Sequence, residues 1–187
     1  MTASSTQALT IEEFLALPNI DESPAWEYVD GMAMQKPMPK TRHSLLQKKL
    51  LSAIDTHSEI YTALPELRCT FAGRSIVPDI AVVGWNRIQV DEMGEAEDNF
   101  TQAPDWSLEI LSPNQNVNRV IDNLLHCIKN GSQLGWLIDP DDYSVLIFLP
   151  QQEPSICKGN SQLPVLAGMN LELTAEQIFA WLKIMKG

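Results

Sequence analysis

The stretch Val77-Pro78-Asp79-Ile80-Ala81-Val82-Val83-Gly84 places one carboxylate immediately before an apolar run of strand length. A second stretch, Ser107-Leu108-Glu109-Ile110-Leu111, encloses another carboxylate in equally apolar surroundings. A charged side chain among such neighbours is rarely buried unless it is paired or binds a metal. We predict that the two stretches form adjacent strands of one sheet, so that Asp79 and Glu109 share one end or face.

Two roles fit this pair of carboxylates. Two oxygen ligands together with a substrate phosphate are a usual way for a protein to hold Mg²⁺, and such a metal activates water and neutralises charge on a phosphate. The alternative role is structural: Asp79 caps a strand after Pro78, and Glu109 pairs with an arginine such as Arg68 or Arg74. These residues alone favour neither role over the other.

Helical and strand patterns alternate on both sides of these stretches. Capping-box patterns beginning at Thr10 and Thr174 predict two short helices, and Asp30-Gly31 predicts a hairpin turn. Apolar residues at three- and four-residue spacing predict longer helices over residues 41–55 and 116–129. The predicted strands are residues 26–29, 32–35, 61–64, 68–71, 77–84, 106–111, 134–138 and 143–149, and residues 85–104 and 151–168 are expected to be irregular. The pattern predicts the α/β class.

Length and composition fit a single globular domain over residues 1–187, with residues 1–9 as a disordered lead-in. The N-terminus has neither a basic start nor an apolar signal region, and no apolar run approaches the roughly 20 residues of a membrane span. The three cysteines, Cys69, Cys127 and Cys157, are scattered and match neither a disulfide framework nor zinc-ligand spacing. We expect a cytoplasmic protein with reduced, inert thiols and no membrane partner.

The charge distribution is uneven. The net charge of −11 argues against general binding of nucleic acid, which needs local positive charge. Residues 36–49 nevertheless contain five basic residues and no acidic one, namely Lys36, Lys40, Arg42, Lys48 and Lys49. This cluster is either a solvated helix face or a surface that holds DNA. His43 lies within it on the core side of the predicted helix, where a hydrogen-bonded core histidine is the more common role. An acidic run follows within residues 91–98 and would repel DNA unless it faces away.

Five segments occur in a fixed order along the chain: Glu27-Tyr28-Val29-Asp30-Gly31, Arg42-His43, Val77-Pro78-Asp79-Ile80-Ala81-Val82-Val83, Leu108-Glu109-Ile110-Leu111-Ser112-Pro113 and Trp136-Leu137-Ile138-Asp139-Pro140. Together they resemble the Uma-type family of restriction-endonuclease-like proteins, within the PD-(D/E)XK nuclease superfamily. The resemblance covers roughly Leu9 to Leu149. It implies a restriction-endonuclease-like fold, in which a mixed central β-sheet of about five or more strands is flanked by α-helices.

The resemblance also implies a site. Asp79 and Glu109 would bind Mg²⁺ or Mn²⁺ together with the backbone carbonyl of Ile110. Glu27 and His43 would lie nearby and either bind a second metal or orient phosphate, which makes Asp79, Glu109, Glu27 and His43 the candidate catalytic residues. DNA is the implied substrate, and Lys40, Arg42, Lys48 and Lys49 are the candidates that grip its backbone.

The chain departs from the pattern of the superfamily at its lysine. Leu111 stands where the lysine is expected, and Asn123 stands at the alternative position used by this family, flanked by Arg119 and Cys127 in place of an acid and a tyrosine. Helical geometry places Arg119 nearly opposite the apolar stripe of its helix. These departures suggest that the metal site is kept and the lysine is lost.

Three functions are therefore compared. The first is a Mg²⁺- or Mn²⁺-dependent endonuclease that hydrolyses DNA phosphodiester bonds, weakened by loss of the lysine. The second is a catalytically inactive relative that binds DNA or a protein partner. A cysteine hydrolase using Cys127 and His126 is a poor third, because adjacent helical residues point about 100° apart. A homodimer is left open by the sequence.

Overall fold

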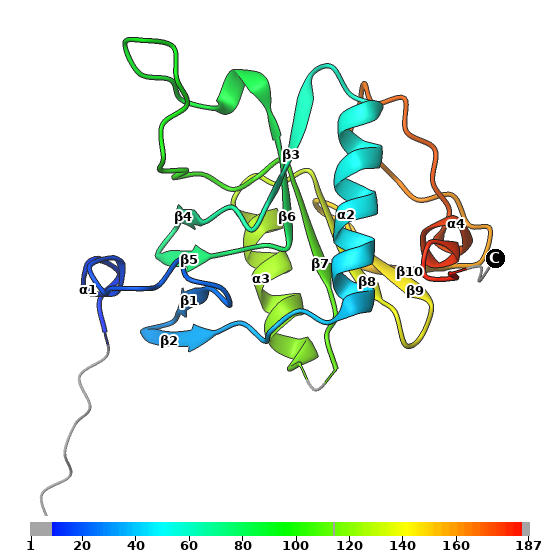
Figure 1. The fold of residues 1–187 in the computed structure, drawn as a ribbon, viewed down its shortest axis with the longest axis horizontal. Coiled ribbons are helices and arrows are strands. Elements are labelled where there is room, and N and C mark those ends of the chain that lie inside the picture. The colour runs from blue at the N-terminus through cyan, green and yellow to red at the C-terminus, as the bar shows by residue number, and fades with distance from the viewer. Residues whose placement is uncertain (1–8, 114, 185–187) are drawn as a thin grey trace, which may run out of the picture.

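The computed structural model describes residues 9–113 and 115–184. Its main element is a mixed six-stranded sheet in the order β10-β9-β8-β7-β6-β3, with helices on both faces (Figure 1). The expected α/β class and the restriction-endonuclease-like arrangement are confirmed. The predicted lead-in falls, except for Leu9, outside the described residues. Within those residues, no helix combines the length and the apolar character needed to cross a membrane.

The central pair of the main sheet is the parallel pair β7–β8, and the other neighbours are antiparallel. The parallel pair requires a crossover connection, which α3 supplies. The strands of this sheet are β3 (Tyr61–Pro65), β6 (Ile80–Gly84), β7 (Trp106–Ile110), β8 (Leu134–Asp139), β9 (Ser144–Phe148) and β10 (Ser155–Lys158). Strand β10 lies at an edge and corrects the prediction that residues 151–168 are irregular.

A smaller antiparallel sheet has the order β2-β1-β5-β4 and consists of β1 (Trp26–Val29), β2 (Met32–Gln35), β4 (Cys69–Phe71) and β5 (Arg74–Ile76). The β1–β2 hairpin agrees with its prediction. The predicted strand over residues 77–84 is too long, because the chain leaves the small sheet after Ile76 and enters the main sheet at Ile80. Pro78 lies at this crossing, where a residue without a backbone N–H interrupts strand pairing.

The helices are α1 (Ile11–Leu15), α2 (Thr41–Thr56), α3 (Val117–Lys129) and α4 (Ala175–Ala180), with the 3₁₀ turn η1 (Trp85–Arg87) inside the otherwise irregular residues 85–104. Thr10 and Thr174 form the predicted capping boxes, and the side chain of Asn116 caps α3. These caps satisfy backbone N–H groups that a helix start leaves free.

The two long helices cover opposite faces of the main sheet. Leu46, Leu50 and Ile54 of α2 pack in one cluster with Leu108 and Ile110 of β7, while α3 packs against the other face through residues such as Val120 and Leu124. Because side chains alternate along a strand, Glu109 must point to the face covered by α3. Glu109 therefore lies on the face of the main sheet that α3 covers, between apolar neighbours in β7.

Leu50→Ala should lower the free energy of unfolding by about 2–5 kcal/mol, because Leu50 is fully buried between α2 and the sheet and its loss leaves a cavity. Urea denaturation followed by circular dichroism measures this change. Ser52→Ala, at an exposed position of the same helix, should change stability by less than about 0.5 kcal/mol. Equal effects of the two substitutions would contradict the packing of α2 described above.

Candidate active site

Asp79 and Glu109 lie at the same end of neighbouring strands. Strands β6 and β7 are antiparallel with Ile80 opposite Leu108, so the residue before Ile80 faces the residue after Leu108. Both carboxylates are buried, with 4% and 3% of their surfaces exposed. The prediction of adjacent strands is confirmed, and the two carboxylates are brought together as expected.

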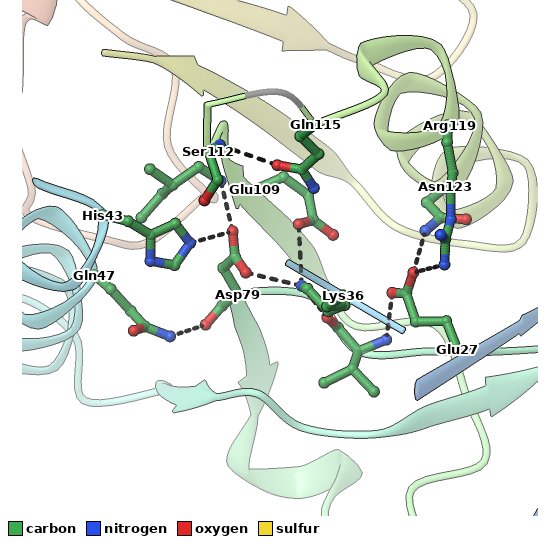
Figure 2. Close-up of polar contacts among 12 residues, drawn as sticks. Glu27, Lys36, His43, Gln47, Asp79, Glu109, Ser112, Gln115, Arg119 and Asn123 are labelled. Atoms are coloured by element: carbon green, nitrogen blue, oxygen red, sulfur yellow. Dashed lines mark hydrogen bonds and ion pairs between the residues drawn. The ribbon is translucent and has the colours of Figure 1, made fainter. Parts of the chain in front are cut away.

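A lysine bridges the two carboxylates. Lys36, directly after β2, donates from Nζ to Asp79 Oδ1 at 2.8 Å and to Glu109 Oε2 at 3.4 Å, and it also donates to the carbonyl of Val77 at 2.5 Å (Figure 2). A single cationic nitrogen thus lies within reach of both carboxylates. In the sequence Lys36 belongs only to the basic cluster of residues 36–49, and its place directly after a predicted strand is the one signal of its position.

The second oxygen of Asp79 is held from the opposite side. His43 Nε2 lies 3.0 Å from Asp79 Oδ2, and the backbone N–H of Ile110 donates to the same oxygen at 2.7 Å. Gln47, one turn after His43 on α2, donates to the backbone carbonyl of Asp79 at 2.8 Å. His43 lies on the core side of the first turn of α2, as predicted, and its hydrogen bond to Asp79 places it in the candidate site.

The three buried charges shift one another's ionisation. Burial alone would lower the pKa of Lys36, but the charges of Asp79, Glu109 and Glu27 outweigh burial and hold that pKa well above its ordinary value. Burial would raise the pKa of Asp79, yet Lys36 and His43 hold it well below the usual range. For Glu109, burial dominates and raises the pKa well above 4.5, because Lys36 offsets it only in part. Lys36 therefore stays protonated beside one firmly ionised carboxylate and one that accepts a proton more readily.

Glu27 is near this cluster but uses both of its oxygens elsewhere. Its Oε1 accepts the backbone N–H of Val77 at 3.0 Å, and its Oε2 accepts from Arg119 Nη2 at 2.8 Å and from Asn123 Nδ2 at 3.3 Å. Val77 also accepts a hydrogen bond from Lys36. Glu27 therefore holds in place the backbone segment that helps to position the Lys36 ammonium. A cleft of about 240 Å³ is lined by residues that include Glu27, Lys36, Glu109, Gln115, Arg119 and Asn123.

The arginines contact other groups than the sequence indicated. A helical position nearly opposite the apolar stripe of α3 does not keep Arg119 from the site, because its long side chain pairs with Glu27. The alternative role for Glu109, a pair with Arg68 or Arg74, fails. Arg68 pairs with Asp21, and Arg74 pairs with aspartates on the protein surface.

The remaining predicted site residues take different places. Lys40, Lys48 and Lys49 are exposed, and Arg42 pairs through Nη1 with Asp141 at 2.7 Å. Only Lys36 of the basic cluster reaches the carboxylates. Ile110 contributes its N–H to Asp79, whereas a metal-binding role of its carbonyl stays a prediction. The described part of the chain contains no group of three or more His, Cys, Asp or Glu side chains placed to hold a metal.

The structure gives no support to a cysteine nucleophile at Cys127. The thiol is buried, and burial raises its pKa to about 12. The neighbouring His126 stacks on Phe71 with ring centroids 4.9 Å apart and hydrogen bonds to the Phe71 carbonyl instead. A thiol held neutral and apart from a base is a poor nucleophile.

A mixed sheet between helices, with a buried carboxylate pair and a lysine at one end, defines the class of restriction-endonuclease-like proteins. The chain belongs to the Uma2 family, described as "Putative restriction endonuclease", whose model matches residues 11–176. It is also similar to the crystal structure of "a putative nuclease belonging to DUF820" from Anabaena variabilis ATCC 29413. That match has 44% sequence identity and a TM-score of 0.90 and covers 94% of this chain and 99% of the other. No curated protein matches the chain. The resemblance noted in the sequence is confirmed.

Lys36→Met should lower the free energy of unfolding at neutral pH by about 3–5 kcal/mol, because it leaves two buried carboxylates without their cation. The loss should shrink as the pH falls toward 4.5. The pKa of Glu109 in the folded state is above 4.5, and removal of Lys36 raises that pKa further. As the pH falls, Glu109 therefore takes up a proton in the folded variant before it does so in the unfolded chain, which removes one uncompensated buried charge. Urea denaturation at a series of pH values measures both effects.

Lys158→Met provides the matched control, because Lys158 pairs with Asp142 on the exposed surface. Exposed ion pairs contribute little to stability. A pH-independent loss for Lys36→Met, or a loss no larger than that of Lys158→Met, would contradict the buried bridge.

Proposed function

We propose that this protein is a Mg²⁺- or Mn²⁺-dependent endonuclease that hydrolyses DNA phosphodiester bonds. The observation that carries the proposal is the convergence of Asp79 and Glu109 on one cationic nitrogen, that of Lys36. A pair of buried carboxylates that already shares a cation is suited to share a metal ion as well. The family description and the similar nuclease structure support the same class of activity.

The residues at this end of the sheet fit a hard divalent cation. Asp79, Glu109 and the carbonyl of Ile110 are oxygen donors of the kind that Mg²⁺ and Mn²⁺ prefer. Glu109 is buried and its pKa is raised, which means that its charge is incompletely compensated by Lys36. A divalent cation would supply that compensation. When bound, the metal would lower the pKa of a water molecule and neutralise charge on the phosphate.

In this proposal Lys36 stabilises negative charge and takes no proton. Its pKa is held well above the ordinary value, so the ammonium has no free lone pair at neutral pH. Its position between Asp79 and Glu109 places positive charge where phosphate oxygens would approach a metal held by the same carboxylates. His43 and Glu27 act as positioning residues, since the first orients Asp79 and the second holds Val77.

The acidic loop begins at the end of β6 that is farthest from Asp79. Strand β6 runs away from Asp79 into residues 85–104, and β7 returns from them to Glu109 (Figure 1). The start of the loop is therefore separated from Asp79 by the length of a five-residue strand, roughly 16 Å at about 3.3 Å per residue. The loop then folds back, and Asp98 at the end of the acidic run lines a hollow together with Val77, so this one carboxylate is the part of the loop that would repel DNA near the site.

Incubation of supercoiled plasmid DNA with the protein and Mg²⁺ or Mn²⁺ should give nicked and linear DNA. Asp79→Asn, Glu109→Gln and Lys36→Met should each reduce the rate at least about 10²-fold, the usual effect of removing a charge-stabilising group. Asp142→Asn, at an exposed ion pair, should keep the wild-type rate. Calorimetric titration with Mn²⁺ should lose its binding signal in Asp79→Asn.

Absence of cleavage by a folded wild-type protein with either metal would end the endonuclease proposal. It would favour the second function considered above, a catalytically inactive protein of the nuclease fold that binds DNA or a protein partner. Cleavage that persists in Asp79→Asn would instead place the active centre elsewhere.

A lysine introduced at position 123 of α3 should partly replace the charge of Lys36. Asn123 is buried and lines the same cleft as Lys36 and Glu109, so a lysine there could direct its ammonium to the same carboxylate. The double variant Lys36→Met/Asn123→Lys should cleave plasmid at least about tenfold faster than Lys36→Met, a fraction of the roughly 10²–10³-fold typical of a charge-stabilising group. Asn118→Lys in the same background is the control, because Asn118 is exposed on the same helix. Equal rates for both double variants would show that cation position is not what Lys36 contributes.

A further inference from the structure

We propose that the Lys36 ammonium and a divalent metal ion exclude each other from the carboxylate pair, so that metal binding moves the ammonium into the adjoining cleft. The inference concerns the regulation of the proposed site and rests on the proposed function, since it assumes that Asp79 and Glu109 are metal ligands. It assigns two positions to Lys36. In the metal-free protein the ammonium bridges the carboxylates, and in the metal-bound protein it lies in the cleft, where a phosphate of DNA can bind it.

The Lys36 ammonium lies where an ion shared by the two carboxylates would have to bind. Its Nζ is 2.8 Å from Asp79 Oδ1 and 3.4 Å from Glu109 Oε2, and it also donates to the carbonyl of Val77. These contacts match the three N–H donors of an ammonium, and Figure 2 shows Lys36 reaching both carboxylates. Because Mg²⁺ binds oxygen at roughly 2.1 Å, an ion on Asp79 Oδ1 would lie within about 5 Å of Nζ.

Asp79 has no other side-chain oxygen to give to a metal. Its Oδ2 accepts the backbone N–H of Ile110 at 2.7 Å and lies 3.0 Å from His43 Nε2. A carboxylate oxygen has about two lone pairs, so these two contacts leave no free lone pair on Oδ2. A metal ion held by Asp79 therefore has to bind Oδ1, the oxygen that Lys36 contacts.

Two cations at this position would be costly. Asp79 and Glu109 carry at most two negative charges, which a divalent ion alone would neutralise. Glu27 does not compensate for a further cation, since its carboxylate is paired with Arg119 at 2.8 Å. The Lys36 side chain is only 12% exposed, so an ammonium kept beside the ion would be a buried charge without a partner. Charge repulsion over a few ångströms therefore favours a metal-bound protein in which the ammonium has moved.

A cleft beside the carboxylates can receive the ammonium. The cleft has a volume of about 240 Å³, and its lining includes Lys36, Glu109 and Arg119. A lysine has a flexible stem of four carbons that ends in a compact charge. Lys36 comes directly after β2, which ends at Gln35, so the stem can turn while the strand keeps its pairing. The move takes the ammonium off Asp79 Oδ1 and leaves its donors free for a phosphate oxygen.

Titration calorimetry with Mn²⁺ alone, without DNA, tests the exclusion. Lys36→Met should bind Mn²⁺ at least about tenfold more tightly than the wild type, because the ion no longer displaces a cation. Its plasmid cleavage should nevertheless fall, whereas damage to the site as a whole would lower both quantities. Lys158→Met is the matched control and should bind Mn²⁺ like the wild type, because Lys158 pairs with Asp142 on the surface. Lys36→Met/Asp79→Asn should lose the tight binding, which locates it at the carboxylate pair.

Lysine methylation in the wild-type protein provides a second measurement, which does not depend on how well Lys36→Met folds. Reductive methylation followed by mass spectrometry reports how accessible each amine is. Without metal, Lys36 should react slowly, because its side chain is 12% exposed and hydrogen-bonded. Saturating Mn²⁺ should raise its rate toward that of Lys158, whose side chain is 53% exposed. The rate of Lys158 itself should not change with Mn²⁺.

The outcomes separate this inference from the proposed function. Tighter Mn²⁺ binding by Lys36→Met, in a protein whose wild type does not cleave DNA, would support the exclusion and remove the endonuclease. Plasmid cleavage by the wild type, with unchanged or weaker Mn²⁺ binding in folded Lys36→Met, would overturn the exclusion and leave the endonuclease. Methylation of Lys36 that does not respond to Mn²⁺, or absence of Mn²⁺ binding from both proteins, would also overturn the exclusion.

Discussion

The burial of the Lys36 ammonium between Asp79 and Glu109 is the interaction on which the rest of this site depends. Each of the three groups would be costly to bury alone. Together they tolerate burial, because one cation lies 2.8 Å and 3.4 Å from the two carboxylate oxygens. The contact also joins parts of the fold that are remote in sequence, since Lys36 directly follows β2 of the small sheet, Glu109 belongs to β7 of the main sheet, and Asp79 directly precedes β6.

The crossing at residues 77–79 makes this geometry possible. Glu27 of the small sheet accepts the N–H of Val77, Lys36 donates to its carbonyl, and Asp79 starts the approach to β6. Pro78 separates the two sheets at this point, because it cannot extend a ladder of backbone hydrogen bonds. The same short segment therefore ends one sheet, begins the other and carries one carboxylate of the site.

Most of the fold could be predicted from local patterns, and the omissions have physical causes. Capping boxes, the Asp30-Gly31 turn and apolar periodicity are short-range signals, and the elements that depend on them agree with the structure. Strand β10 was missed because it is an edge strand whose side chains are mostly exposed, so it lacks a buried face that would give alternation. The short β5 was missed because it has only three residues and the predicted strand over residues 77–84 begins directly after it.

The candidate site was only partly predictable for a related reason. The backbone positions of Asp79 and Glu109 follow from strand patterns, whereas the positions of the Lys36 and Arg119 side-chain ends depend on long flexible stems. Such stems can carry a charge several bonds away from the backbone, and even around a helix surface, as Arg119 does to reach Glu27. The spacing of residues along the sequence therefore does not predict where the charged ends of the Lys36 and Arg119 side chains lie.

This flexibility changes the meaning of the absent lysine at positions 111 and 123. The energy with which an ammonium stabilises a negative charge depends on the distance between the two charges. It does not depend on which strand or helix carries the lysine. A proton acceptor would need a lowered pKa and a directed lone pair, but the pKa of Lys36 is raised by the carboxylates it bridges. Charge stabilisation therefore requires only that a positive charge lies close to the two carboxylates. In the proposed endonuclease, Lys36 supplies this charge from the position directly after β2, so the absence of a lysine at positions 111 and 123 does not imply the absence of its charge.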